Sequence, residues 1–167
     1  MRVNAYYHAL SHLLRVTAAT SRHPERDAVI LLLSHACGMR ITEIAQVTVA
    51  DLMHPSGKWR QEVSLRAAIT KGCKQRCTYL TSKKLLAALD AYVAYRLAKG
   101  LATTLEPGPY RGLLPHLPML ISRRGGAYSL NTKRRTLLDG ERRDYKAADS
   151  LQVHVTRLYK RAGIKGG

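Results

Sequence analysis

Residues 38–45 read Gly38-Met39-Arg40-Ile41-Thr42-Glu43-Ile44-Ala45, and they follow a predicted helix, residues 25–36, that is apolar nearly all round. A helix of this kind is usually buried on every side, so we expect a rigid central element. Thr42 is a candidate cap for a second helix through about Val47, and Glu43 suits the positive end of that helix. Arg40 is therefore predicted to lie on a rigid support, which fixes the position of its charge.

A β-hairpin is predicted after this stretch. From residue 61 to residue 70, apolar residues alternate with mostly polar ones, which is the period of a strand with one buried face. Residues 76–80 are its expected partner strand, and Lys71 lies in the turn beside Gly72. Lys71 abuts the end of the first strand, which favours it as the cation that this turn presents. The alternative is a plain turn in which Lys74 and Arg76 are its equals.

The remaining pattern predicts a mostly helical α+β fold with a small antiparallel sheet at one edge. Helices are expected over residues 4–17, 82–100 and 150–162, because their apolar residues recur at helical spacing. A long loop, residues 101–118, is rich in Pro and Gly. A second hairpin is expected around Arg123-Arg124-Gly125-Gly126, with short strands over residues 119–122 and 127–129.

Composition points to a polyanionic partner. The 167 residues fit one domain, and 28 Lys or Arg against 11 Asp or Glu give a net charge of +17. Residues 111–167 hold 13 Lys or Arg and 4 Asp or Glu, interleaved with apolar residues, so the excess belongs to a folded surface. Double-stranded DNA is the expected partner. The alternative is a cationic surface that serves only solubility.

The cysteines and the apolar runs argue against a secreted, a zinc-binding or a membrane-spanning protein. The three cysteines are odd in number and no secretory segment precedes them, so a reducing cytoplasm is expected. Cys73 and Cys77 have no nearby Cys or His at ligand spacing, and we therefore predict no zinc site and no cofactor. The longest apolar run, residues 28–33, is too short to span a membrane.

In this order and spacing, residues 38–45 and 69–80 resemble the catalytic domain of tyrosine recombinases, the phage-integrase family. The resemblance covers roughly residues 22–165 and implies an integrase-like α+β domain that breaks and rejoins DNA without metal. It implies that Arg40 neutralises charge on the phosphate oxygens, which a planar guanidinium does in bidentate fashion. It also implies that Lys71 protonates the departing 5′ oxygen as general acid, and that Glu43 supports the arginine.

Each of these residues has a plainer interpretation. Arg40 is alternatively a solvated charge at a helix end, and Glu43 an acid that interacts only with the helix dipole. Arg123 and Arg124 are candidates for phosphate contacts, together with Lys74 and Arg76, but a turn with two glycines also favours solvated charge.

The family also uses an H-x-x-R box and a tyrosine nucleophile. The H-x-x-R nearest the C-terminus joins His154 to Arg157, and His154 shares the apolar face of the last predicted helix. Residues 157–164 instead resemble the helix and glycine stop that precede the box. Only Tyr159 follows Arg157, on the buried face. The expectation is a catalytic domain cut before its box and nucleophile, without the family's N-terminal DNA-clamping domain, and inactive alone.

Two classes of function follow. The first is an integrase-type recombinase domain, bacterial or phage-encoded and nucleoid-associated, for DNA integration and recombination. The second is a non-catalytic DNA-binding remnant or regulator, which competes with an intact recombinase. An RNA-binding protein ranks last, because the aromatic residues are not clustered as in a stacking platform. Self-association is expected if the apolar stripe of residues 151–162 is exposed.

Overall fold

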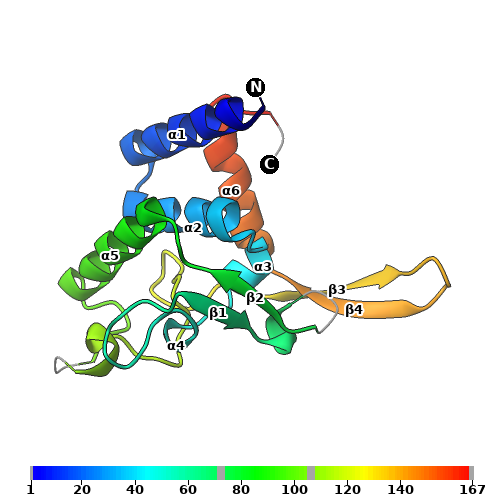
Figure 1. Ribbon diagram of the computed structural model, residues 1–167. Helices are drawn as coiled ribbons and strands as arrows, with labels where there is room; N and C mark the ends of the chain where they lie inside the picture. The colour runs from blue at the N-terminus through cyan, green and yellow to red at the C-terminus, as the bar shows by residue number, and fades with distance from the viewer. Residues whose placement is uncertain (1, 71–73, 105–107, 166–167) are drawn as a thin grey trace.

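The protein is an α+β domain, and its computed structural model describes residues 2–70, 74–104 and 108–165, with side chains from residue 7 onward (Figure 1). The predicted fold class is confirmed: helices dominate and the strands form small antiparallel sheets. The helices are α1 (Arg2–Thr20), α2 (Pro24–Cys37), α3 (Ile41–Ile44), α4 (Val49–Leu52), α5 (Lys83–Ala98) and α6 (Asp149–Arg161). The strands are β1 (Glu62–Leu65), β2 (Arg76–Tyr79), β3 (Asn131–Thr136) and β4 (Arg142–Ala147), and 3-10 turns cover Ala67–Ile69 and Pro109–Gly112.

Helix α2 is the centre of the molecule, as its apolar sequence predicts. It packs against both α1 and α5, and residues 29–33 are buried all round the helix (Figure 1). The helix ends at Gly38, whose φ of 59° lies in the left-handed region that glycine adopts without strain. The next residue, Met39, is buried in the core and donates its backbone N–H to the Leu33 carbonyl. The chain therefore leaves α2 on a fixed path.

The hairpin of β1 and β2 forms with the predicted pairing. Its antiparallel register runs from Glu62 opposite Tyr79 to Leu65 opposite Arg76. The first strand is shorter than the predicted residues 61–70, because a 3-10 turn follows it, closed by a bond from the Ile69 N–H to the Arg66 carbonyl. Ile69 is nevertheless buried, so the alternating pattern correctly marks the inward side chains.

The hairpin predicted around residues 123–126 is wrong. This segment turns tightly, with a 2.7 Å bond from the Ser122 N–H to the Gly126 carbonyl, but no strands flank it. The apolar residues before this turn, 119–121, are held in the core by side chains. The Ile121 N–H donates to the Tyr92 hydroxyl, and the Met119 carbonyl accepts from Arg96. Backbone groups satisfied in this way need no partner strand.

Strands β3 and β4 form a hairpin that the sequence analysis missed. They pair from Asn131 opposite Ala147 to Thr136 opposite Arg142, and the ribbon projects away from the helices (Figure 1). Every residue of these strands is exposed except Ala147, which is half-buried, so neither face carries the alternating apolar signal of a packed strand. The Asp139-Gly140 dipeptide at its tip was the available signal, since Asp-Gly is typical of a tight hairpin turn.

Helix α6 buries its apolar stripe within the same chain. Leu151, Val155 and Leu158 are buried, and Leu158 packs with Leu13 of α1 and Leu31 of α2. The stripe is therefore not an exposed contact surface, contrary to the expectation on which self-association depended. The helix is long enough to reach both the central helix and α1 (Figure 1).

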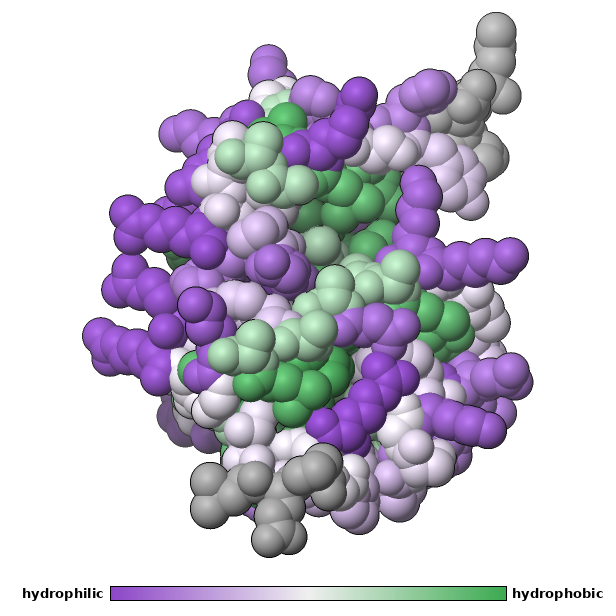
Figure 2. Space-filling view, turned by 90° about the vertical axis from the view of Figure 1, so that its left-hand side faces the viewer, coloured by the Kyte–Doolittle hydropathy of each residue, from purple (hydrophilic) through white to green (hydrophobic). Residues whose placement is uncertain are grey.

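Hydrophilic side chains are prominent on the face of the molecule that Figure 2 draws. Figure 2 shows the face on the α5 side, where many hydrophilic side chains project and hydrophobic ones gather nearer the middle. In the described part of the chain, no helix is long and apolar enough to cross a membrane. Across the same residues, no group of three or more His, Cys, Asp or Glu side chains is placed to hold a metal ion.

Candidate functional site

Arg40 lies at the mouth of α3, as predicted, but it is itself the residue that precedes the first helical turn. Its backbone is extended, and its N–H donates to the Glu43 carboxylate at 2.8 Å. Arg40 therefore takes the capping position that the sequence analysis gave to Thr42. The side chain of Arg40 remains 56% exposed, so its guanidinium reaches solvent from a backbone that is fixed on both sides.

Glu43 organises this site, because its buried carboxylate serves two arginines. The side chain is 1% exposed and accepts from the Arg40 guanidinium at 3.2 Å and from Arg76, which bonds to both of its oxygens. Burial alone would raise the pKa of Glu43, but the hydrogen bond from Arg76, the Arg40 N–H and both positive charges outweigh it and hold that pKa below its ordinary value. The carboxylate is therefore ionised at neutral pH.

Arg76 is the residue that links the hairpin to the end of α2. It begins β2, and besides Glu43 it donates to the Gly38 carbonyl at 3.0 Å. The structure thus brings Arg76 next to Arg40 and Glu43, although Arg76 lies far from both of them in the sequence. Most donors of Arg76 are engaged inside the protein, whereas Arg40 makes one bond to Glu43 and keeps donors for an external anion.

Lys71, with Gly72 and Cys73, lies outside the described residues. The flanking Thr70 and Lys74 are described, and the Thr70 hydroxyl donates to the Lys74 carbonyl at 2.6 Å. Thr70 also lines a cavity beside Arg40, which is described next. Lys74 is exposed, in keeping with a contact to a large anion or with a solvated turn. The role of Lys71 stays a prediction.

A cavity of about 460 Å³ opens beside Arg40, and the β3–β4 hairpin forms one of its walls. On the body of the protein it is lined by Arg40, Thr42, Glu43, Gln46 and residues 68–70. On the hairpin it is lined by Arg135 and residues 143–147, which include the cations Arg143 and Lys146. We name this space the Arg40 cleft. Its hairpin wall depends on tertiary structure and could not be assigned from the sequence pattern.

The hairpin wall is cationic but ordered. Three cations of the β3–β4 hairpin are paired with acids, Lys133 with Asp149, Arg134 with Asp144 and Arg143 with Glu141, and Arg143 is the one of the three that lines the cleft. Arg135 lies over the ring of Tyr145, with its guanidinium carbon 5.9 Å from the ring centre. These contacts limit the rotamers of side chains that would otherwise sample solvent freely. The hairpin therefore presents its charges in a definite arrangement.

The other predicted site residues lie in a second cavity. Arg123 and Arg124 on the 122–126 turn meet His154 and Arg157 of α6 around a space of about 680 Å³. His154 is half-buried rather than packed in the core, and its Nε2 lies 2.8 Å from the Asp27 carboxylate. The structure thus places the H-x-x-R pair away from the Arg40 cleft. Three arginines that the sequence analysis did not select also line this space: Arg22, Arg26 and Arg161.

Comparisons with known proteins support the fold alone. No protein-family model matches the chain, and no curated protein matches it. Among solved structures, the chain is similar to the crystal structure of XerA recombinase, with 16% sequence identity and a TM-score of 0.56. The match covers 94% of this chain and 41% of that one, so the chain spans less than half of the recombinase. The protein therefore has a recombinase-like fold over nearly all of its length.

Proposed function

We propose that this chain is a single DNA-binding domain of the tyrosine-recombinase type, and that it binds the phosphate backbone of duplex DNA in the Arg40 cleft. One observation carries the proposal: a buried, ionised Glu43 holds Arg40 and Arg76 in place at the edge of a cationic cavity. A preorganised guanidinium binds phosphate in bidentate geometry and pays little conformational entropy on binding.

In this proposal Arg40 neutralises the charge that develops on the non-bridging phosphate oxygens during strand exchange. Glu43 and Arg76 are positioning residues, because they act by fixing Arg40 rather than by touching the phosphate. Lys71 is the proposed general acid, and Lys74, three residues later in the sequence, is a proposed contact to the DNA backbone. Catalysis further requires a nucleophile and an H-x-x-R box, and the proposal leaves both to the remainder of a recombinase. His154 and Arg157 do not line the Arg40 cleft.

A second candidate function is DNA binding without catalysis. It is favoured by Tyr159, the tyrosine that follows His154 and Arg157, because its hydroxyl lies 2.5 Å from His35 Nε2. Tyr159 lines neither the Arg40 cleft nor the second cavity. The two candidates separate when this chain is joined to the C-terminal part of a recombinase, which supplies the nucleophile, and is tested on nicked duplex DNA. A recombinase site then forms a covalent protein–DNA complex, whereas a binding module gives only dissociable complexes.

We expect the affinity for duplex DNA to fall steeply with salt. Among the described residues, four cations line the Arg40 cleft: Arg40, Arg135, Arg143 and Lys146. Neutralising about four phosphates gives a slope of about −3.6 in a plot of log affinity against log salt, a loss of about a hundredfold between about 50 and 200 mM. Fluorescence anisotropy with a labelled duplex measures this slope. A slope near zero would rule out phosphate binding as the basis of affinity.

A further inference from the structure

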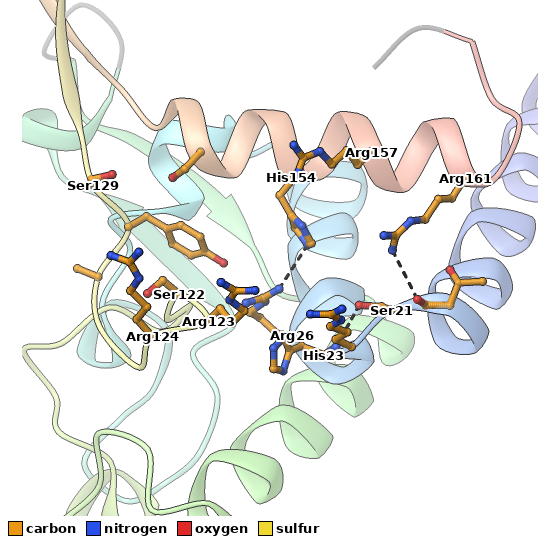
Figure 3. A pocket seen from close by; sticks show the side chains of 15 residues that line it. Ser21, His23, Arg26, Ser122, Arg123, Arg124, Ser129, His154, Arg157 and Arg161 are labelled. Atoms are coloured by element: carbon orange, nitrogen blue, oxygen red, sulfur yellow. Dashed lines mark hydrogen bonds between the residues drawn. The ribbon is translucent and has the colours of Figure 1, made fainter.

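The second cavity lies between the α1–α2 connection, the 122–129 loop and α6, and we name it the arginine cavity. Figure 3 shows its labelled side chains converging from these separate elements, with His154 of α6 reaching toward Arg26 of α2. Its volume of about 680 Å³ is within the range of sites that enclose small molecules.

The charge of this cavity is almost entirely positive. Six arginines line it, and none of the described lining residues is an Asp or Glu. The arginines are Arg22, Arg26, Arg123, Arg124, Arg157 and Arg161. So many guanidiniums around one space repel one another unless an anion with several charges lies between them. A single carboxylate would leave most of this charge uncompensated.

Arg26 is a preformed part of the cavity. Its side chain is 8% exposed and donates to Asp27 through Nε at 3.0 Å and Nη2 at 2.9 Å. Asp27 also accepts from the Ser21 hydroxyl at 2.5 Å and lies beside His154. Burial would raise the pKa of Asp27, but His154, Arg26 and Ser21 more than offset this effect and lower it. Asp27 thus fixes Arg26 and neutralises one charge, but does not itself line the cavity.

Tyr128 supplies a second, independent observation that points to a ligand in this cavity. It lines the cavity, and its hydroxyl oxygen is buried without a hydrogen-bond partner among the described residues. Burial raises the pKa of Tyr128 to about 12, so the hydroxyl stays protonated at neutral pH. A buried donor without an acceptor is costly in a native protein, and a small movement of the Tyr128 ring that turns the hydroxyl toward the cavity would let an anionic oxygen satisfy it.

We propose that the arginine cavity is a binding site for an anion that carries consecutive phosphate groups. Guanidinium groups from three segments provide the forked donors that phosphate accepts, and Tyr128 provides a neutral donor. The phosphates come either from a free oligophosphate, such as the phosphate chain of a nucleotide, or from a nucleic-acid backbone. This proposal does not depend on Arg40 or on recombinase activity.

Isothermal titration calorimetry with inorganic tripolyphosphate tests the site. The wild-type protein binds one tripolyphosphate, and the double variant Arg123→Gln/Arg157→Gln binds it at least about tenfold more weakly, because it loses two charge-assisted hydrogen bonds. The matched control is Arg134→Gln/Arg142→Gln, which removes the same charge from the β3–β4 hairpin and retains wild-type affinity. Absence of binding by the wild type, or equal weakening in both double variants, would overturn the proposal.

Tyr128→Phe separates binding from folding. This change removes the unpartnered hydroxyl, so the melting temperature of the free protein is expected to stay the same or rise. Affinity for tripolyphosphate should nevertheless fall about three- to tenfold, because one donor to the anion is lost. Unchanged affinity in Tyr128→Phe would show that the hydroxyl does not contact the anion. The proposal would then lose the second of its two observations.

Competition then identifies the source of the phosphates. Displacement of tripolyphosphate by a short duplex, in both the wild type and Arg40→Gln, assigns the cavity to a DNA backbone. Simultaneous binding of tripolyphosphate and duplex assigns it to a free oligophosphate. Failure of DNA binding altogether would contradict the function proposed for the Arg40 cleft, while the tripolyphosphate series would still test the arginine cavity.

Discussion

Replacing Glu43 by Gln is expected to lower the free energy of unfolding by about 2 kcal/mol. Removing one partner of a buried ion pair leaves the remaining charge uncompensated, which costs about 3–5 kcal/mol when both partners are buried. The value here is smaller because Arg40 and Arg76 are partly exposed and water replaces some of the lost interaction. Gln retains an oxygen for the Arg40 N–H, so the start of α3 is preserved. Urea unfolding monitored by circular dichroism measures the difference.

The pH dependence of this difference provides a further test. The pKa of Glu43 in the folded protein lies below its ordinary value of 4.5, so the stabilisation is fully present above the pKa of the unfolded chain. It is lost as the pH falls through the lower folded-state pKa. The wild type and Glu43→Gln should therefore differ at neutral pH and converge in acid. Glu62→Gln, an exposed position on β1, is the control and should change stability by less than about 0.5 kcal/mol. Equal effects of the two substitutions would contradict the role of Glu43.

Arg96→Met is expected to cause the largest loss of stability, about 4 kcal/mol. The Arg96 side chain is 0% exposed, and its guanidinium donates to the carbonyls of Leu101, Ala102 and Met119 at 3.0–3.1 Å, with a longer bond to Pro118. Methionine fills similar space but leaves these carbonyls without donors, and each buried unsatisfied group costs about 1–3 kcal/mol. Much of a small domain's stability, about 5–15 kcal/mol, would be lost.

Limited proteolysis locates the effect of Arg96→Met. Its acceptors lie on the segment that joins α5 to the 122–126 turn, so this segment should be cleaved faster in the variant than in the wild type. Lys99→Met, an exposed position just after α5, serves as the control for the loss of a cation and should leave the cleavage rate unchanged. A variant as stable and as resistant as the wild type would show that Arg96 does not fasten this segment.

Local sequence pattern predicted the elements that have their own apolar face. The buried helix α2, the β1–β2 pairing and helices α5 and α6 each follow from spacing, and their ends differ from the predictions by a few residues. The β3–β4 hairpin could not be found in this way, because its strands bury almost nothing. The 119–129 segment was misjudged for the opposite reason: its apolar residues are buried by side-chain contacts rather than by strand pairing.

The candidate site was predictable only where its residues are close in sequence. The family resemblance implied that Glu43 supports Arg40, and these two residues, three apart in sequence, form an ion pair. The shared use of Glu43 by Arg76 depends on where β2 docks, which no local pattern contains. Arg96 is similar: its charge favours the surface, but it follows the buried Tyr92 by one helical turn, and that position was the available signal.

The arginine cavity shows the same limit. Arg123 and Arg124 were selected from a glycine-rich turn, and His154 and Arg157 from their motif, without any reason to join the two pairs. Packing of α6 against α1 and α2 brings them together with Arg22, Arg26 and Arg161. A cluster of like charges made by tertiary structure has no signature in sequence except the overall excess of basic residues.

The most direct test of the account is the affinity of Arg40→Gln for duplex DNA, compared with that of Arg15→Gln across a salt titration. Arg15 is an exposed arginine of α1 that does not line the Arg40 cleft, so both variants remove one surface charge. Arg40→Gln should weaken binding about tenfold and reduce the salt slope by about one, whereas Arg15→Gln should change the affinity much less. Equal losses in the two variants would show that the protein attracts DNA by net charge alone, and that the arginine fixed by Glu43 does not bind phosphate.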